Sequence, residues 1–97
     1  MSQQTRLGTH ATTVRYENGA TIVRYHQTDI LKFNEDKIIL NTGGWNTTTT
    51  KKRLNQASAQ FGLNYHVYQK NYDWLVEYKG RVIIWIEPIL ILDRKEV

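Results

Sequence analysis

The feature that most limits how this chain can fold is a single helical segment in its middle, with short alternating runs on both sides. Leu54, Ala57 and Phe61 recur at the spacing of one narrow apolar stripe on a helix. The flanking runs alternate apolar and polar residues, which is typical of strands with one buried face. We therefore expect an α+β fold with one central helix near residues 49–61.

Both ends of this helix carry recognisable signals. Thr48 or Thr49 can act as the N-cap, because a threonine hydroxyl accepts a backbone N–H that has no partner inside the helix. Gly62 follows the last apolar residue and suits the left-handed conformation that ends many helices.

The N-terminal part predicts a four-stranded meander over residues 12–41. Asn18-Gly19 favours a type I′ hairpin turn, which pairs Val14 with Val23 and, on either side, Tyr16 with Thr21 and Thr12 with Tyr25. This register places Val14, Tyr16, Val23 and Tyr25 on one face, and Arg15 and Arg24 on the other. A second hairpin joins residues 30–33 to residues 37–41 through the acidic turn Asn34-Glu35-Asp36.

The C-terminal part predicts a second meander of three strands, residues 64–69, 72–78 and 81–87. Two-residue turns at Lys70-Asn71 and Lys79-Gly80 pair Val67 with Trp74 and Val76 with Ile83. Residues 89–92 form a last edge strand or dock on the second face of this meander. The two β-meanders give an antiparallel sheet, or two small sheets, of six to eight strands packed on the helix. The predicted core is Leu54, Phe61, Val67, Trp74, Val76 and Trp85.

Length and composition narrow the class of protein. The 97 residues are expected to form a single domain, with residues 1–10 as a flexible tail. No apolar run approaches the ~18 residues of a membrane helix, and the N-terminus lacks the apolar core of a secretory signal. We expect a protein of the cytoplasm, or of the host cytoplasm if the protein is viral, with no membrane partner.

The residues for catalysis or metal binding are sparse. The chain has no cysteine, which excludes thiolate metal sites and disulfides. His10, His26 and His66 lie far apart without a metal-binding spacing. His26 and His66 could meet across the sheet as a metal-free nuclease pair, but structural or surface histidines are the more common case. We expect no enzyme activity, no metal and no cofactor.

A glycine pair precedes the helix. Gly43-Gly44 is compatible with a loop that holds phosphate through backbone N–H groups, or with a tight connection between strand and helix. Trp45 follows, and a tryptophan there either closes the end of the core or offers a surface on which bases stack.

The strongest functional signal is a basic cluster at the start of the helix, Thr49-Thr50-Lys51-Lys52-Arg53. Lys51, Lys52 and Arg53 account for +3 of the formal net charge of +4, and no acidic residue follows until Asp73. The helix dipole already places positive charge at this end, so the cations should cost a few tenths to ~1 kcal/mol of helix stability. An unfavourable local choice often marks a functional site. The cluster therefore predicts an anion site, with phosphate as the first candidate; the alternative is a solvated face of the helix.

The same stretch carries a resemblance. Residues 41–55 read NTGGWNTTTTKKRLN and follow the segment His26-Gln27-Thr28-Asp29. This resembles a group of small uncharacterised bacteriophage and prophage proteins with the pattern N-x-G-G-W-x-T-x-T-T-K-x-R-x-N after an HxTD segment. The resemblance covers about the middle third of the chain. It implies a viral accessory protein and adds no catalytic residues.

Two classes of function follow. The first is binding of nucleic acid or of a nucleotide through Gly43, Gly44, Trp45, Thr49, Thr50, Lys51, Lys52 and Arg53. The alternative is a protein-interaction module that inhibits or modulates a host enzyme through the apolar second face of the last meander. Residues 82–92 are apolar on both faces, so we also expect a homodimer.

Overall fold

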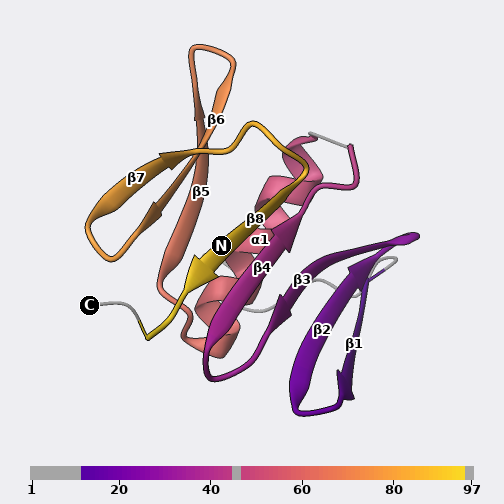
Figure 1. Ribbon diagram of the computed structural model, residues 1–97. Helices are drawn as coiled ribbons and strands as arrows, with labels where there is room; N and C mark the ends of the chain where they lie inside the picture. Colours follow the sequence, from indigo (N-terminus) through magenta and orange to yellow (C-terminus); the bar gives the residue numbers. More distant parts are fainter. Residues whose placement is uncertain (1–11, 45–46, 96–97) are drawn as a thin grey trace, which may run out of the picture. The chain divides into compact units, whose positions relative to one another are not determined.

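The computed structural model describes residues 12–44 and 47–95. It contains one helix and eight strands in two antiparallel sheets of five and three strands, which confirms the predicted α+β class (Figure 1). The chain divides into two compact units. We call residues 12–44 and 87–95 the sheet unit, and residues 47–86 the helix unit. The single-domain organisation stays a prediction.

The sheet unit is one five-stranded antiparallel sheet in the order β1-β2-β3-β4-β8. Its first four strands form the predicted meander, and β8 pairs with β4. The prediction of a last edge strand is therefore confirmed. The strands are β1 (Thr12–Glu17), β2 (Ala20–Tyr25), β3 (Thr28–Phe33), β4 (Lys37–Asn41) and β8 (Ile89–Asp93).

The turns of the sheet unit form where their residues favour them. Asn18 and Gly19 both have positive φ angles, 51° and 81°, as a type I′ turn requires. The predicted pairing of Val14 with Val23 is confirmed in full register. In the β3–β4 turn, Asn34 Oδ1 accepts the backbone N–H groups of Asp36 and Lys37 at 2.8 and 2.9 Å.

Apolar residues of the inner strands make up the buried part of this sheet. The fully buried side chains are aliphatic, as a central sheet position demands. They are Val23, Ile30, Leu31, Ile38 and Leu40.

The helix unit consists of α1 (Thr48–Phe61) and a three-stranded sheet in the order β5-β6-β7. These strands are β5 (Tyr65–Lys70), β6 (Asp73–Tyr78) and β7 (Arg81–Ile84). The helix contacts β5. Gly62 has a φ of 65° and donates its backbone N–H to the Ser58 carbonyl, so the predicted left-handed helix end is confirmed.

The N-cap prediction is wrong by one residue. Thr47, not Thr48 or Thr49, has the extended backbone of a cap, and its Oγ1 accepts the N–H of Thr50 at 3.2 Å. The reason lies in the sequence, because residues 47–50 are all threonine and each can cap equally well.

The β5–β6 hairpin also differs from the prediction. The turn is Asn71-Tyr72, with positive φ angles of 51° and 71°, instead of Lys70-Asn71. Val67 consequently pairs with Val76 rather than with Trp74. A shift of one residue in the turn moves the register by two, so every side chain keeps its predicted face.

The predicted core is nearly correct. Five of its six members are buried, and the sixth, Phe61, is half-buried. The pairing of Val76 with Ile83 is confirmed, and the rings of Trp74 and Trp85 meet edge to face at 5.8 Å. The sequence did not indicate that Thr50, Gln56 and Ser58 of α1 are also buried.

Candidate functional site

The glycine pair lies in the sheet unit, directly after β4, and its N–H groups already have acceptors. Gly43 N donates to Asn41 Oδ1 at 2.8 Å, and Gly44 N donates to Thr42 Oγ1 at 3.2 Å. A phosphate cradle needs backbone N–H groups that point at the ligand. The geometry therefore favours the second interpretation of Gly43-Gly44, a tight connection.

Gly43 has a structural reason to be glycine. Its φ is 63°, and a Cβ at this position would lie 2.7 Å from Thr28 Oγ1. Thr28 belongs to the HxTD segment, and its neighbour Asp29 forms ion pairs with Arg15 at 2.9 Å and Arg24 at 3.1 Å. These contacts hold the pKa of Asp29 below its usual range, with the hydrogen bond from Arg15 as the main cause. Two segments of the phage-like pattern thus meet inside the sheet unit.

The remaining predicted site residues are distributed as follows. Trp45 lies outside the described residues. Thr49, Thr50, Lys51, Lys52 and Arg53 belong to the helix unit and share the start of α1. We therefore treat the helix start as the candidate site, and the participation of Gly43, Gly44 and Trp45 stays a prediction.

The threonines at the helix start divide into a buried one and an exposed one. Thr50 is 2% exposed, and its hydroxyl lies 3.0 Å from that of the cap residue Thr47. Its N–H and hydroxyl are therefore used inside the protein. Thr49 is exposed, as is Thr48, and both lie in the first turn, where an α-helix leaves N–H groups without acceptors of its own.

Two of the three cations, Lys51 and Arg53, contact neutral side chains. Lys51 Nζ contacts Gln69 Oε1 at 3.4 Å and lies 5.6 Å from the centre of a Trp74 ring, within the range of a cation–π interaction. Arg53 Nη1 donates to Gln56 Oε1 at 3.0 Å. Lys52 is exposed. Both amides are neutral, so neither of these two contacts offsets a positive charge.

The charge of the two units differs sharply. Residues 47–86 hold six lysines and arginines against two acids, Asp73 and Glu77, which gives a formal charge of +4. The described residues of the sheet unit hold six of each sign, which gives zero. The sheet unit also pairs its cations, as in Lys37–Asp93 and Lys95–Asp36. The net charge of the chain is thus concentrated in the helix unit, where two acids can neutralise at most two of six cations.

Polar contacts that the sequence pattern did not indicate join α1 to β5. Asn55 Nδ2 donates to the Val67 carbonyl and Asn55 Oδ1 accepts the Val67 N–H, both at 2.8 Å. Ser58 Oγ does the same for Tyr65, at 2.7 and 3.1 Å. The spacing of Asn55 and Ser58, three residues apart on one helix face, is the signal that could have revealed them.

These contacts cover the outer edge of the three-stranded sheet and orient the helix on it. The Tyr65 hydroxyl adds a hydrogen bond of 2.6 Å to the Leu54 carbonyl. Burial raises the pKa of Tyr65 above its usual value near 10, so the phenol stays a donor at neutral pH. The helix start is therefore fixed relative to β5, with Lys51 beside Gln69 at the far end of the strand.

The histidines show no catalytic arrangement in the described chain. His26 lies in the β2–β3 turn and His66 on β5, so they belong to different sheets, and His10 lies outside the described residues. Residues 12–44 and 47–95 contain no cluster of three histidines and acids suited to a metal ion. Within the same residues, no helix has the length and apolar character needed to span a membrane.

Comparison with known proteins places the chain among viral proteins. The model of the family described as Kyanoviridae Gp96 protein matches residues 1–88. A search of curated proteins and a search of solved structures each found no match. The family match confirms the phage relationship and leaves the specific motif a prediction. Since it spans most of the sequence, the chain belongs to the family of Kyanoviridae Gp96 phage proteins.

Proposed function

We propose that this phage protein is a non-enzymatic accessory protein that binds a phosphate-bearing polyanion, nucleic acid first, at the start of α1. The observation that carries the proposal is the concentration of a formal charge of +4 in residues 47–86, with three adjacent cations at the positive end of the helix. A local excess of this kind attracts polyanions through counterion release. The sheet unit, with balanced charge, serves as a scaffold.

The details of the helix start support this proposal. The first turn contains no acid, and its cap is the neutral hydroxyl of Thr47. The N–H groups of Thr48 and Thr49 point along the helix axis, as at other helix N-termini that bind anions. Thr49 and Lys52 are exposed, and Lys51 is half-buried. A phosphate group in front of this turn would meet N–H donors and cations together.

The test uses two exposed lysines that differ only in place. Lys52→Glu reverses the charge at the helix start, whereas Lys32→Glu makes the same change on β3 of the sheet unit. The proteins are titrated with single-stranded and double-stranded oligonucleotides and with a nucleoside triphosphate at several salt concentrations. We expect Lys52→Glu to weaken oligonucleotide binding about tenfold or more and to reduce the salt slope, as for a lost phosphate contact.

Lys32→Glu should change the affinity much less. Equal effects of the two substitutions would reduce the interaction to overall charge and contradict a site on α1. Binding of the triphosphate with the affinity of the oligonucleotides would identify a nucleotide as the ligand. Absence of oligonucleotide and nucleotide binding at low salt would refute the proposal.

A protein partner is the second candidate, and exposed apolar side chains favour it. Val82 and Ile84 on the outer face of the three-stranded sheet are 57% and 58% exposed, and their row continues through the half-buried Leu75 and Tyr68. Apolar side chains grouped on one face are typical of protein interfaces. Association with a host enzyme through this face should persist in high salt, unlike polyanion binding, and should be lost in Ile84→Lys.

A further inference from the structure

The outer edge of β7 carries backbone groups that face away from its own sheet. The β6–β7 turn is Lys79-Gly80, with positive φ angles of 52° and 74°, and Tyr78 pairs with Arg81. In such a hairpin the pair beside the turn is hydrogen-bonded, and bonded and non-bonded pairs then alternate. Trp85 N donates to Trp74 O at 2.8 Å, which fits this alternation.

It follows that Val82 and Ile84 stand in the non-bonded pairs. Their partners on β6 are Glu77 and Leu75. The N–H and C=O groups of Val82 and Ile84 therefore point outward, along the edge of the sheet. Within residues 12–44 and 47–95 these groups have no hydrogen-bond acceptor or donor.

At the opposite edge of the same sheet, formed by β5, helix side chains bind outward backbone groups. On β5, the side chains of Ser58 and Asn55 satisfy the outward backbone groups of Tyr65 and Val67. The chain thus covers most of this edge of its three-stranded sheet with helix side chains. An uncovered edge is a template for another strand.

We propose that the occupant of the β7 edge is β7 of a second copy of this chain, in an antiparallel arrangement about a two-fold axis through Ile83. In this register Val82 lies opposite Ile84 of the second copy, and Ile84 opposite its Val82. Both are hydrogen-bonded pairs, so the contact forms four backbone hydrogen bonds from groups that otherwise have no partner. This register also keeps the two faces of the sheet consistent, because each residue lies opposite a residue that points to the same face of the joined sheet.

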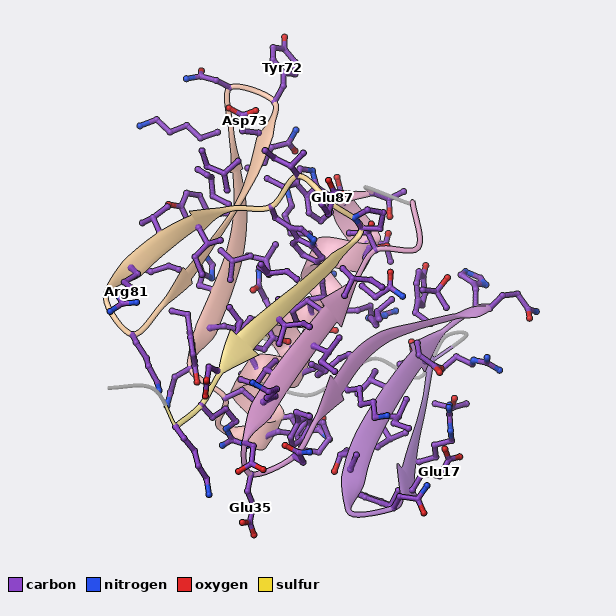
Figure 2. All side chains as sticks on the ribbon, viewed as in Figure 1. Glu17, Glu35, Tyr72, Asp73, Arg81 and Glu87 are labelled. Atoms are coloured by element: carbon purple, nitrogen blue, oxygen red, sulfur yellow. The ribbon has the colours of Figure 1, made fainter. Side chains whose placement is uncertain are left out.

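The side chains also match in this register. Val82 and Ile84 of both copies form one apolar block on the outer face, which extends the row that begins with Tyr68 and Leu75. Arg81 is the charged residue of β7 and lies beside the β6–β7 turn (Figure 2). It meets Trp85 of the second copy, so no like charges face each other across the strands.

The outer strands β1 and β8 of the five-stranded sheet are less well suited to pair with the same strand of a second copy. In the register that corresponds to the one proposed for β7, with Val14 opposite Tyr16 of a second β1, the two-fold axis would pass through Arg15, so that two arginines lie opposite each other. For β8, centring on Ile91 places Ile89 opposite Asp93, and centring on Leu90 places Asp93 opposite Glu87. Like charges directly opposite destabilise strand pairing, and edge charges are a common protection against it. In the centring of β8 on Ile91 the mismatch is between an apolar and an acidic side chain. These mismatches favour β7 over β1 and β8.

The first experiment measures the oligomeric state by analytical ultracentrifugation from micromolar to millimolar protein. We expect a monomer–dimer equilibrium in the unaltered chain. Ile84→Pro removes an outward N–H without removing a β6–β7 hydrogen bond, and it should raise the dimer Kd about tenfold or more. Val14→Pro is the matched control, because its N–H faces outward on the edge strand β1, and the dimer should persist.

The second experiment tests the register. The chain has no cysteine, so Ile83→Cys gives a single thiol. Residues of a non-bonded antiparallel pair have Cα atoms ~4.5 Å apart, which a disulfide can span. Mild oxidation should link Ile83→Cys into a covalent dimer, whereas Tyr16→Cys on β1 should stay mostly unlinked.

Several results would overturn the proposal. A chain that stays monomeric at millimolar concentration has no such interface. A dimer that survives Ile84→Pro, or one that Val14→Pro dissociates, does not form through the β7 edge. A dimer that dissociates on Ile84→Pro while Ile83→Cys resists oxidation pairs in another register. Circular dichroism of each variant shows that the monomeric fold is retained.

Discussion

The hydrogen bonds between α1 and β5 lead to a quantitative prediction for Asn55→Ala. Asn55 makes two bonds of 2.8 Å to the backbone of Val67, which is 1% exposed. Each protein hydrogen bond contributes about 1 kcal/mol net, and a buried group left without a partner costs about 1–3 kcal/mol. Alanine is the better helix former by about 0.5 kcal/mol, which offsets part of the loss. We expect the free energy of unfolding to fall by about 1–2 kcal/mol.

Two measurements check this value. Urea unfolding gives the free energy directly, and a domain of this size should lose about 5–15 °C in Tm. Hydrogen exchange is more specific, because the Val67 amide should lose protection through the missing acceptor. The amide of Val76, on the central strand β6, should exchange as before once corrected for global stability.

Lys52→Ala is the matched control for this prediction. Lys52 lies on the same helix but is exposed, so its removal should change stability by less than about 0.5 kcal/mol. If Asn55→Ala proves as neutral as Lys52→Ala, or if the Val67 amide keeps its protection, the side chain does not cover the β5 edge and the reasoning is wrong.

Three further predictions concern stability. Trp74→Ala should cost about 3–5 kcal/mol in urea unfolding, since the ring is buried against Trp85, and an unchanged midpoint would contradict the core assignment. Gly43→Ala should cost about 1–3 kcal/mol through its positive φ and the contact with Thr28, and clearly more than Gly44→Ala, where a Cβ meets nothing within 4 Å. Burial raises the pKa of Tyr65, so its contribution to the free energy of unfolding is complete below pH ~10 and is lost as the pH rises further. Tyr65→Phe should therefore reduce the loss of stability measured above pH ~10. An unchanged loss would mean that other groups cause it.

The local signals of the sequence predict the hairpins and the faces of the strands well. Asn18-Gly19 permits one register, and the structure has it. In the β5–β6 hairpin both Lys70-Asn71 and Asn71-Tyr72 can form a two-residue turn, and alternation allows either because they differ by two in register. The pattern of faces is therefore more predictable than the pairing itself.

The contacts between secondary-structure elements were harder to predict from the sequence than the strands themselves. The spacing of Asn55 and Ser58 places both on one helix face, but the backbone groups that they bind are known only once the position of β5 is known. The pairing of β8 with β4 joins segments about fifty residues apart, and no local signal specifies it. The basic cluster was located from sequence, but the use of the Gly43 and Gly44 N–H groups by Asn41 and Thr42 depends on the loop geometry.

The choice of cap adds a further argument about the helix start. Aspartate caps a helix as well as threonine does and would also reduce the repulsion among Lys51, Lys52 and Arg53. The chain instead caps with Thr47 and holds Lys51 and Arg53 with the neutral amides of Gln69 and Gln56. Each of these groups fixes a position without reducing the positive field. If the cations served only solubility, an acid in the first turn would improve stability at no cost, so Thr48→Asp should stabilise the helix unit while weakening oligonucleotide binding. A variant that gains stability and keeps its full affinity would show that the field at the helix start has no part in binding.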